Sequence, residues 1–148
     1  MVGQSCIFPI LPINRPYFWN HSLSMKEITL EFIFNSSPGV LFNRLSTPSG
    51  LAEWFCDDVK VDREGTYHFE WDGAEELAEL VKKKSGEFVL FKWIDRDDEP
   101  TFEFRLKRDP MTQDLALIVT DYVEEGEEEE TRLLWESQIG ELKRILGN

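Results

Sequence analysis

The residues of this chain that could do nucleophilic or metal chemistry are few and lie far apart. The chain has two cysteines and two histidines. Cys56 directly precedes Asp57-Asp58, whose negative charges would raise the pKa of its thiol and disfavour a reactive thiolate. His21 and His68 have no cluster of Cys, His or acidic residues at metal-ligand spacing. We therefore predict no catalytic residue, no metal site and no cofactor.

Acidic side chains offer further candidates for chemistry, and each has a simpler interpretation. Asp121 could act as an acid or base if burial raised its pKa, but a solvated strand end is the favoured interpretation. Asp95–Glu99 lacks the glycine and the spacing of a calcium-binding EF-hand loop and indicates a hydrated hairpin tip. Glu124–Glu130 could attract a basic partner, although a solvated loop and helix start is favoured there.

Length and charge narrow the classes of function. The 148 residues suffice for one domain with a hydrophobic core. The net charge is −13 and Lys and Arg do not gather in a basic stripe, so nucleic acid and anionic membrane surfaces are poor partners. Two cysteines are too few for a disulfide framework or a zinc site, which favours a reducing compartment. We predict a cytoplasmic protein.

Residues 1–24 differ in pattern from the rest of the chain. Prolines interrupt their apolar middle, no positive charge precedes it, and it is too short to span a bilayer. We predict an N-terminal extension that is disordered or loosely docked, consistent with a start codon assigned too far upstream, followed by one domain over residues 25–148. The alternative is an arm that packs Phe18 and Trp19 onto the domain.

The domain begins with a strand and two short helices. Apolar and polar residues alternate over Lys26–Phe34, which predicts a half-buried strand. Ser37-Pro38 and Thr47-Pro48 then provide a capping hydroxyl and a proline suited to the first helical position. The second helix is expected to end at Trp54-Phe55.

Six further strands are expected, joined by tight turns into an antiparallel meander. Asp72-Gly73 is a strong hairpin signal between two of them. Residues 74–84 consist of good helix formers, but their neighbours are strands with turns on both sides, so we interpret them as a strand. The expected strands cover residues 58–62, 66–71, 74–84, 87–94, 101–107 and 115–123.

The chain ends in a long amphipathic helix. Acidic Glu127–Glu130 suits its positive end, and Gly147 is a plausible C-terminal cap. A curved sheet needs a cover for its apolar face, and no other predicted element is long enough. The apolar positions of this helix, spaced by three and four residues, are Leu134, Trp135, Ile139, Leu142, Ile145 and Leu146.

Several packing motifs occur in a family-specific order. On these residues most of 25–148 resembles the helix-grip fold of the START-like (SRPBCC) superfamily. Within it the chain is most similar to the branch of the activators of the heat-shock chaperone ATPase, through their C-terminal domain. The matching residues are Leu51-Ala52-Glu53-Trp54, Glu64–Trp71, Val89–Trp93, and the helix pattern Trp135, Ile139, Leu142 and Leu146.

Two positions depart from the pattern of that branch. Leu134 stands where a glycine often precedes the helix tryptophan, and Thr120-Asp121 stands where a histidine often ends the last strand. The resemblance implies an α+β fold: a strand, two short helices, a curved antiparallel sheet of about six further strands, and a long C-terminal helix across it.

The resemblance also implies a function, because members of this superfamily often carry an apolar ligand between helix and sheet. We expect a non-enzymatic binding module for a small hydrophobic ligand. The alternatives are a core filled by the same side chains, a chaperone-regulator-like domain with a protein partner, and a cyclase- or dehydratase-type enzyme. The candidate cavity residues are Trp54, Phe69, Trp71, Phe91, Trp93, Phe102, Phe104, Trp135, Ile139 and Leu142.

Overall fold

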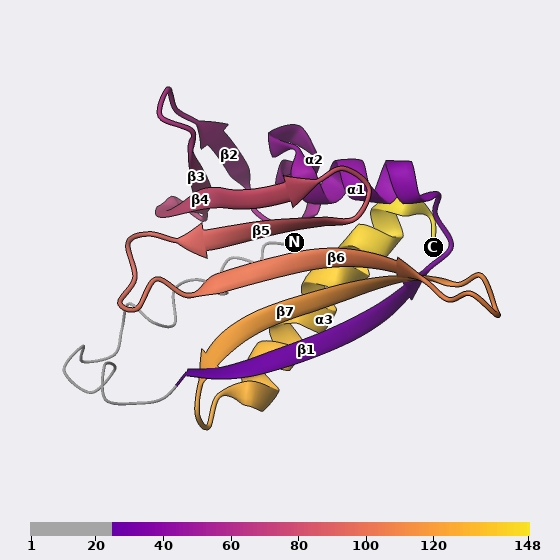
Figure 1. Ribbon diagram of the computed structural model, residues 1–148. Helices are drawn as coiled ribbons and strands as arrows, with labels where there is room; N and C mark the ends of the chain where they lie inside the picture. Colours follow the sequence, from indigo (N-terminus) through magenta and orange to yellow (C-terminus); the bar gives the residue numbers. More distant parts are fainter. Residues whose placement is uncertain (1–24) are drawn as a thin grey trace.

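The computed structural model describes residues 25–148, which form one antiparallel sheet with three helices (Figure 1). The predicted extension, residues 1–24, lies outside the described residues. The strands are β1 (Met25–Phe34), β2 (Asp58–Val61), β3 (Thr66–Trp71), β4 (Ala74–Lys84), β5 (Phe88–Trp93), β6 (Thr101–Arg108) and β7 (Leu115–Glu124).

The strand order β1-β7-β6-β5-β4-β3-β2 places the first and last strands of the chain side by side. Met25 lies opposite Glu124 and Phe34 lies opposite Leu115, with unbroken antiparallel register between these two pairs. β1 and β2 are therefore the two edges of the sheet. Consecutive strands from β2 to β7 are neighbours in the sheet and are joined by hairpin connections, of which the longest is the expected acidic loop at residues 94–100.

The segment 74–84 is a strand, as predicted, despite its helix-forming composition. It is hydrogen-bonded to β3 on one side and β5 on the other, with one register shift between Leu80 and Lys82. Ala78 points into the core and is fully buried. Tertiary pairing thus overrides local helix propensity.

Both short helices begin as the sequence indicates. The helices are α1 (Pro38–Ser46), α2 (Pro48–Trp54) and α3 (Glu128–Leu146). The Ser37 side chain accepts a hydrogen bond from the Val40 N–H, and the Thr47 side chain accepts one from the Gly50 N–H. Each hydroxyl satisfies a backbone donor that the helix itself leaves free.

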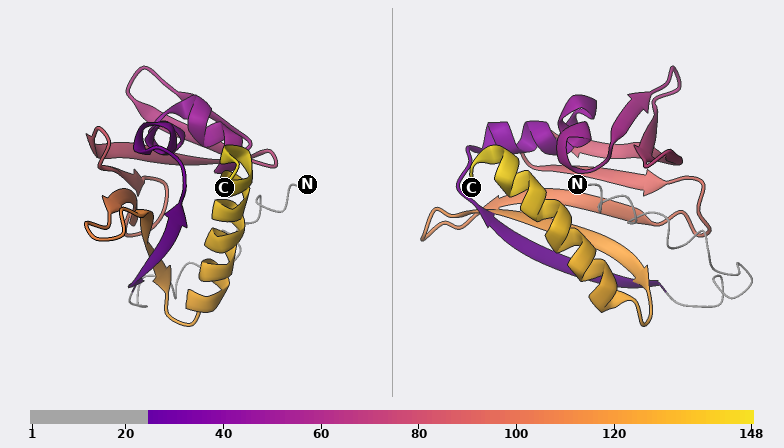
Figure 2. Two further views of the ribbon diagram at one scale, coloured as in Figure 1. Left: turned by 90° about the vertical axis from the view of Figure 1, so that its right-hand side faces the viewer. Right: turned by 180° about the vertical axis from the view of Figure 1, so that it is seen from behind.

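α3 lies across the sheet, as the helix-grip fold requires. Seen from behind, it runs diagonally from the turn after β7 toward the two short helices (Figure 2). It ends at Gly147, whose left-handed backbone (φ 76°) accommodates the turn after the helix. None of the helices within residues 25–148 is long and apolar enough to cross a bilayer.

Candidate functional site

All ten candidate cavity residues are buried, and all belong to one hydrophobic cluster between α3, α2 and the sheet. Their rings contact one another closely. The Phe102 ring stacks on Trp93 at a centroid distance of 4.9 Å and on Phe91 at 5.1 Å. The Trp135 ring from α3 meets Phe104 edge-on at 5.7 Å. The sequence therefore identified residues that do come together in the fold.

Phe55 is a member of this cluster that the candidate set omitted. It follows α2 directly and is fully buried, and its ring stacks on Trp135 at 6.1 Å. Its backbone carbonyl accepts two side-chain hydrogen bonds, from Trp71 Nε1 at 2.7 Å and from Gln138 Nε2 at 3.1 Å. A single carbonyl thus links the end of α2 to β3 and α3.

Gln138 was not predicted as a buried residue, because it is polar and does not belong to the apolar stripe of α3. Its side chain is 2% exposed. The bond to the Phe55 carbonyl fixes the amide so that Nε2 donates. The other end of the amide, Oε1, is buried and has no hydrogen-bond partner among residues 25–148. An unsatisfied buried acceptor costs stability.

The favoured interpretation of Asp121 as a solvated strand end was wrong. Asp121 is 9% exposed and points from β7 under α3. Its carboxylate accepts from Trp135 Nε1 at 2.9 Å and from the Tyr122 backbone N–H at 2.7 Å. Burial raises the pKa of Asp121, and these two hydrogen bonds oppose the rise.

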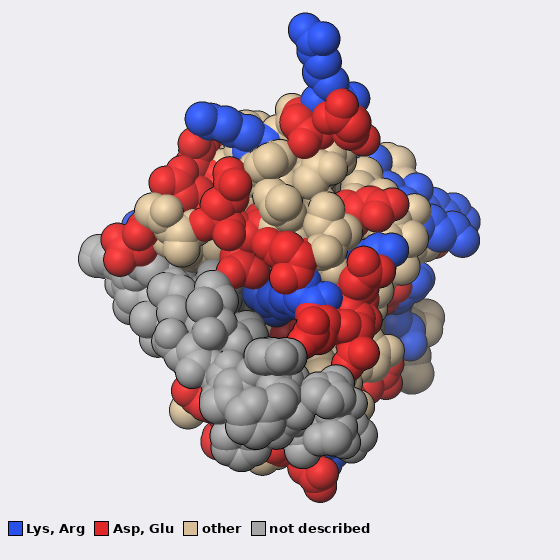
Figure 3. Space-filling view, turned by 90° about the vertical axis from the view of Figure 1, so that its left-hand side faces the viewer, with Lys and Arg blue, Asp and Glu red and all other residues tan. Residues whose placement is uncertain are grey.

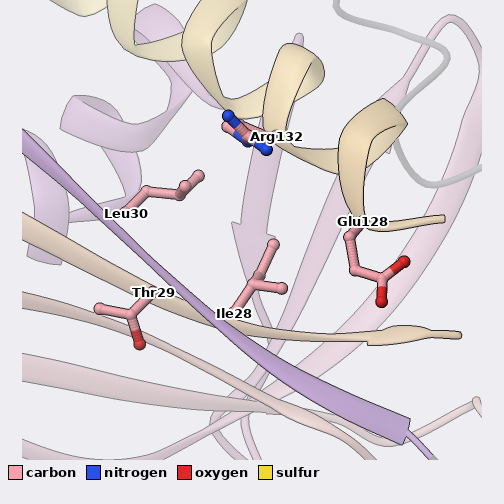
Figure 4. A pocket seen from close by; sticks show the side chains of 5 residues that line it. All are labelled: Ile28, Thr29, Leu30, Glu128 and Arg132. Carbon is pink, nitrogen blue, oxygen red and sulfur yellow. The ribbon is translucent and has the colours of Figure 1, made fainter. Parts of the chain in front are cut away.

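A hollow of about 380 Å³ lies between β1 and the first turns of α3 (Figure 4). Ile28 and Leu30 point from β1 toward the helix and form its apolar floor, whereas Thr29 points the opposite way. Ile28 lies directly opposite Asp121 in the β1–β7 ladder. One floor residue of the hollow is thus the ladder partner of the residue that bonds Trp135.

Two side chains of opposite charge, Glu128 and Arg132, line the helix side of this hollow. Hydrogen bonding to the backbone and pairing with Lys26 Nζ at 3.1 Å lower the pKa of Glu128. Arg132 Nη2 lies 2.7 Å from Glu129 Oε1. The hollow thus combines an apolar floor with ionised groups at its rim, an arrangement suited to a ligand with an apolar body and a polar end.

The hollow residues were not predicted as a site. The sequence did place Ile28 and Leu30 on the inward face of the first strand. That face is incompletely covered because β1 is the sheet edge and α3 crosses it at an angle, so Leu30 stays half-buried. No sequence motif reports the angle at which a helix crosses a sheet.

The remaining candidates for chemistry have structural explanations. Cys56 is buried, and burial raises the pKa of its thiol to about 12, which keeps it protonated. His68 lies between Asp62, at 2.9 Å, and Glu75, at 3.2 Å, on the outer side of the sheet. Within residues 25–148 no group of His, Cys, Asp and Glu side chains could hold a metal ion.

Charge is distributed over the surface without a continuous basic area on the face shown in Figure 3. There, Asp and Glu side chains lie in several groups, with Lys and Arg between and around them. This agrees with the net charge of −13. The visible face offers no surface suited to a polyanion.

Comparison with known proteins identifies the family. A model of the START-like superfamily domain matches residues 23–148. Among solved structures, BfR322 from Bacteroides fragilis is 32% identical with a TM-score of 0.60, over 83% of this chain and 92% of that one. No curated protein matches this chain. These matches confirm the START-like helix-grip domain predicted from the sequence.

Two more distant structures share the fold. The Aha1 dimer from Colwellia psychrerythraea is 18% identical with a TM-score of 0.69, and the match covers 82% of this chain and 96% of that one. DynU16, a protein of the dynemicin biosynthetic locus, is 16% identical with a TM-score of 0.68, over 82% of this chain and 47% of that one.

Proposed function

The chain belongs to the START-like superfamily, and on this basis we propose that it is a non-enzymatic binding module for a small, mainly apolar ligand held between α3 and the sheet. The observation that carries the proposal is the hollow of about 380 Å³ over Ile28 and Leu30. Its size falls at the lower end of small-molecule sites. Removing apolar surface from water would drive binding, at about 25 cal/mol per Å².

The buried ring cluster is the proposed inner wall of this site. None of the ten candidate cavity residues lines the hollow itself. The link to them is Trp135, whose indole donates to Asp121, the ladder partner of Ile28. A ligand lying on Ile28 and Leu30 would have its apolar end toward this ring. Glu128 and Arg132 would contact its polar end.

The test of this site is a titration with 1-decanol followed by amide NMR. The ligand is expected to shift the resonances of residues 28–30 and 128–132. Ile28→Trp should abolish these shifts by filling the hollow. Ile33→Trp is the matched control, because Ile33 lies on the outer face of the same strand and is 46% exposed. Equal titrations of both variants would contradict the proposed site.

Native mass spectrometry of freshly purified protein addresses the natural ligand. Co-purified apolar mass would identify the ligand class. The same mass should be absent from the Ile28→Trp variant and present in Ile33→Trp. Retention by both variants would place the ligand elsewhere on the chain.

A cytoplasmic location is part of the proposal. It is supported by Cys56, which is a free thiol in the core. The alternative function, docking of a protein partner of the chaperone type, is supported by the shared fold with the Aha1 dimer, whose sequence is only 18% identical. A separate observation, the open edge of the sheet at β1, also favours a protein partner.

A further inference from the structure

β1 is an edge strand of the sheet, and within residues 25–148 only one of its two sides is paired. It pairs with β7 along all ten residues of β1, and no other strand within residues 25–148 pairs with its second side. β1 contains no proline, and its register with β7 has no bulge. The opposite edge is different, because β2 has only four residues.

Natural sheets protect their edges with short strands, prolines, bulges or exposed lysines, because a free row of N–H and C=O groups pairs readily with another chain. β2 follows this rule through its length. β1 has a single lysine, Lys26, and its ammonium is paired with Glu128 at 3.1 Å. Within residues 25–148 the long edge of this sheet therefore has no cover against strand addition.

The side chains of β1 indicate what kind of strand would fit. Glu27, Glu31 and Ile33 are exposed. Ile28, Leu30 and Phe32 lie on the helix side and are half-buried, so the edge leaves part of their apolar surface uncovered. An added strand would place alternate side chains beside the acidic face and beside the apolar face.

We propose that β1 docks an extended segment of a partner protein in which basic residues alternate with apolar ones. Its basic side chains would lie beside Glu27 and Glu31, and its apolar side chains beside Ile28 and Leu30. A second copy of this chain fits poorly, because each copy has a net charge of −13 and would bring acidic edges together. This surface uses the free backbone edge and the outer face of β1, whereas the proposed small ligand lies on the helix side of the strand, and the two sites share Ile28 and Leu30.

The probe is a capped synthetic peptide of alternating lysine and valine, added to the full-length, isotope-labelled protein at low salt. We expect slower hydrogen exchange at alternate β1 amides and amide shifts in β1. A peptide of alternating glutamate and valine is the charge control and should not bind. Because the contact is partly electrostatic, added salt should weaken binding of the lysine peptide.

The edge variant is Glu31→Lys with Ile33→Lys, which adds two exposed lysines to β1. Binding of the lysine peptide should fall about tenfold or more. The control is Glu79→Lys with Val81→Lys on β4, an exposed pair at the same spacing on an interior strand of the sheet, where Glu79 is paired with both β3 and β5 and Val81 lies at the register shift. Its binding should stay within about twofold of the parent protein.

Several outcomes would overturn the proposal: no binding of the lysine peptide, equal loss in both variants, or protection at β2 instead of β1. Self-association of the protein through β1 would show that a second copy is the occupant, and would also overturn it. The 1-decanol titration is repeated on the edge variant. If the edge variant still shows the decanol-induced shifts but no longer binds the lysine peptide, then strand addition and small-ligand binding can fail independently.

Discussion

Trp135 donates its indole N–H to the buried carboxylate of Asp121 at 2.9 Å, and this bond joins α3 to the strand beneath it. The two residues lie 14 positions apart in the chain, on either side of the turn between β7 and α3. The bond fixes how the first half of the helix sits over the sheet.

Two substitutions of Trp135 separate the effect of losing this hydrogen bond from the effect of losing the ring. Trp135→Phe keeps an aromatic ring but leaves Asp121 without its indole donor, and should lower the free energy of unfolding by about 1–3 kcal/mol. Trp135→Ala also empties the ring site, and should lower it by about 3–5 kcal/mol. Urea denaturation measures both. A loss well below these values for Trp135→Ala would show that the ring is not a core element.

Asp121 should make stability depend on pH in an uncommon direction. Burial raises the pKa of Asp121 in the folded chain. Its contribution to the stability of the fold is therefore complete at a pH below its pKa in the unfolded chain, and is lost as the pH rises through its pKa in the folded chain. Asp121→Asn cannot titrate, so its stability should improve relative to the parent protein as pH rises. Urea denaturation across a pH series from about pH 4 to pH 7 measures this difference.

A carboxyl with the opposite shift is the control for this experiment. Hydrogen bonding to His68 lowers the pKa of Asp62, so the contribution of Asp62 is lost as pH falls. The free energy of unfolding of Asp62→Asn should therefore rise relative to that of the parent protein as the pH falls. If the free energy of unfolding of the parent protein and of Asp121→Asn changed with pH in parallel, the raised pKa of a buried Asp121 would be contradicted.

Gln138→Met should leave the free energy of unfolding within about 1 kcal/mol of the parent value, or raise it. The variant removes Oε1, which has no hydrogen-bond partner among residues 25–148, and the Phe55 carbonyl keeps its bond from Trp71. Gln138→Glu is the contrasting variant, because it would bury a carboxylate and should destabilise by several kcal/mol. A loss above about 2 kcal/mol in the methionine variant would mean that Oε1 is hydrogen-bonded in solution.

Gly50→Ala should destabilise the helix pair by about 1–3 kcal/mol. A methyl group there would meet Arg44 Cα at 2.7 Å and Thr47 Oγ1 at 2.8 Å, so α1 and α2 would have to move apart. Gly140→Ala in α3 is the matched control, since its methyl group would meet nothing within 4 Å. It should stabilise by up to about 1 kcal/mol through helix propensity. Thermal unfolding of both variants tests the close contact, and equal effects would contradict it.

The architecture could be predicted from the sequence because its signals are local and repeated. Alternation of Tyr67, Phe69 and Trp71 identifies the buried face of β3, and hydroxyl–proline pairs identify the starts of α1 and α2. The strand at 74–84 required an argument from its neighbours, since its own residues favour a helix. The ring cluster followed from these faces once the helix was placed over the sheet.

The polar features of the site could not be predicted, because they depend on tertiary geometry. The sequence around Asp121 indicates a solvated strand end, yet α3 covers this residue and Trp135 donates a hydrogen bond to it. Gln138 reads as a solvated helix residue, yet the carbonyl that binds it is 83 positions away. The hollow lies where α3 crosses the edge strand obliquely and Ile28 and Leu30 are only half-buried.

Intermolecular NOEs test the central proposal of a small-ligand site most directly. The experiment uses methyl-labelled protein and 1-decanol. We predict NOEs from the decanol chain to the methyl groups of Ile28 and Leu30, and none to Ile33 on the opposite face of β1. NOEs confined to exposed methyl groups such as those of Ile33, Val40 and Met111, or no NOEs at all, would contradict a site between α3 and the sheet.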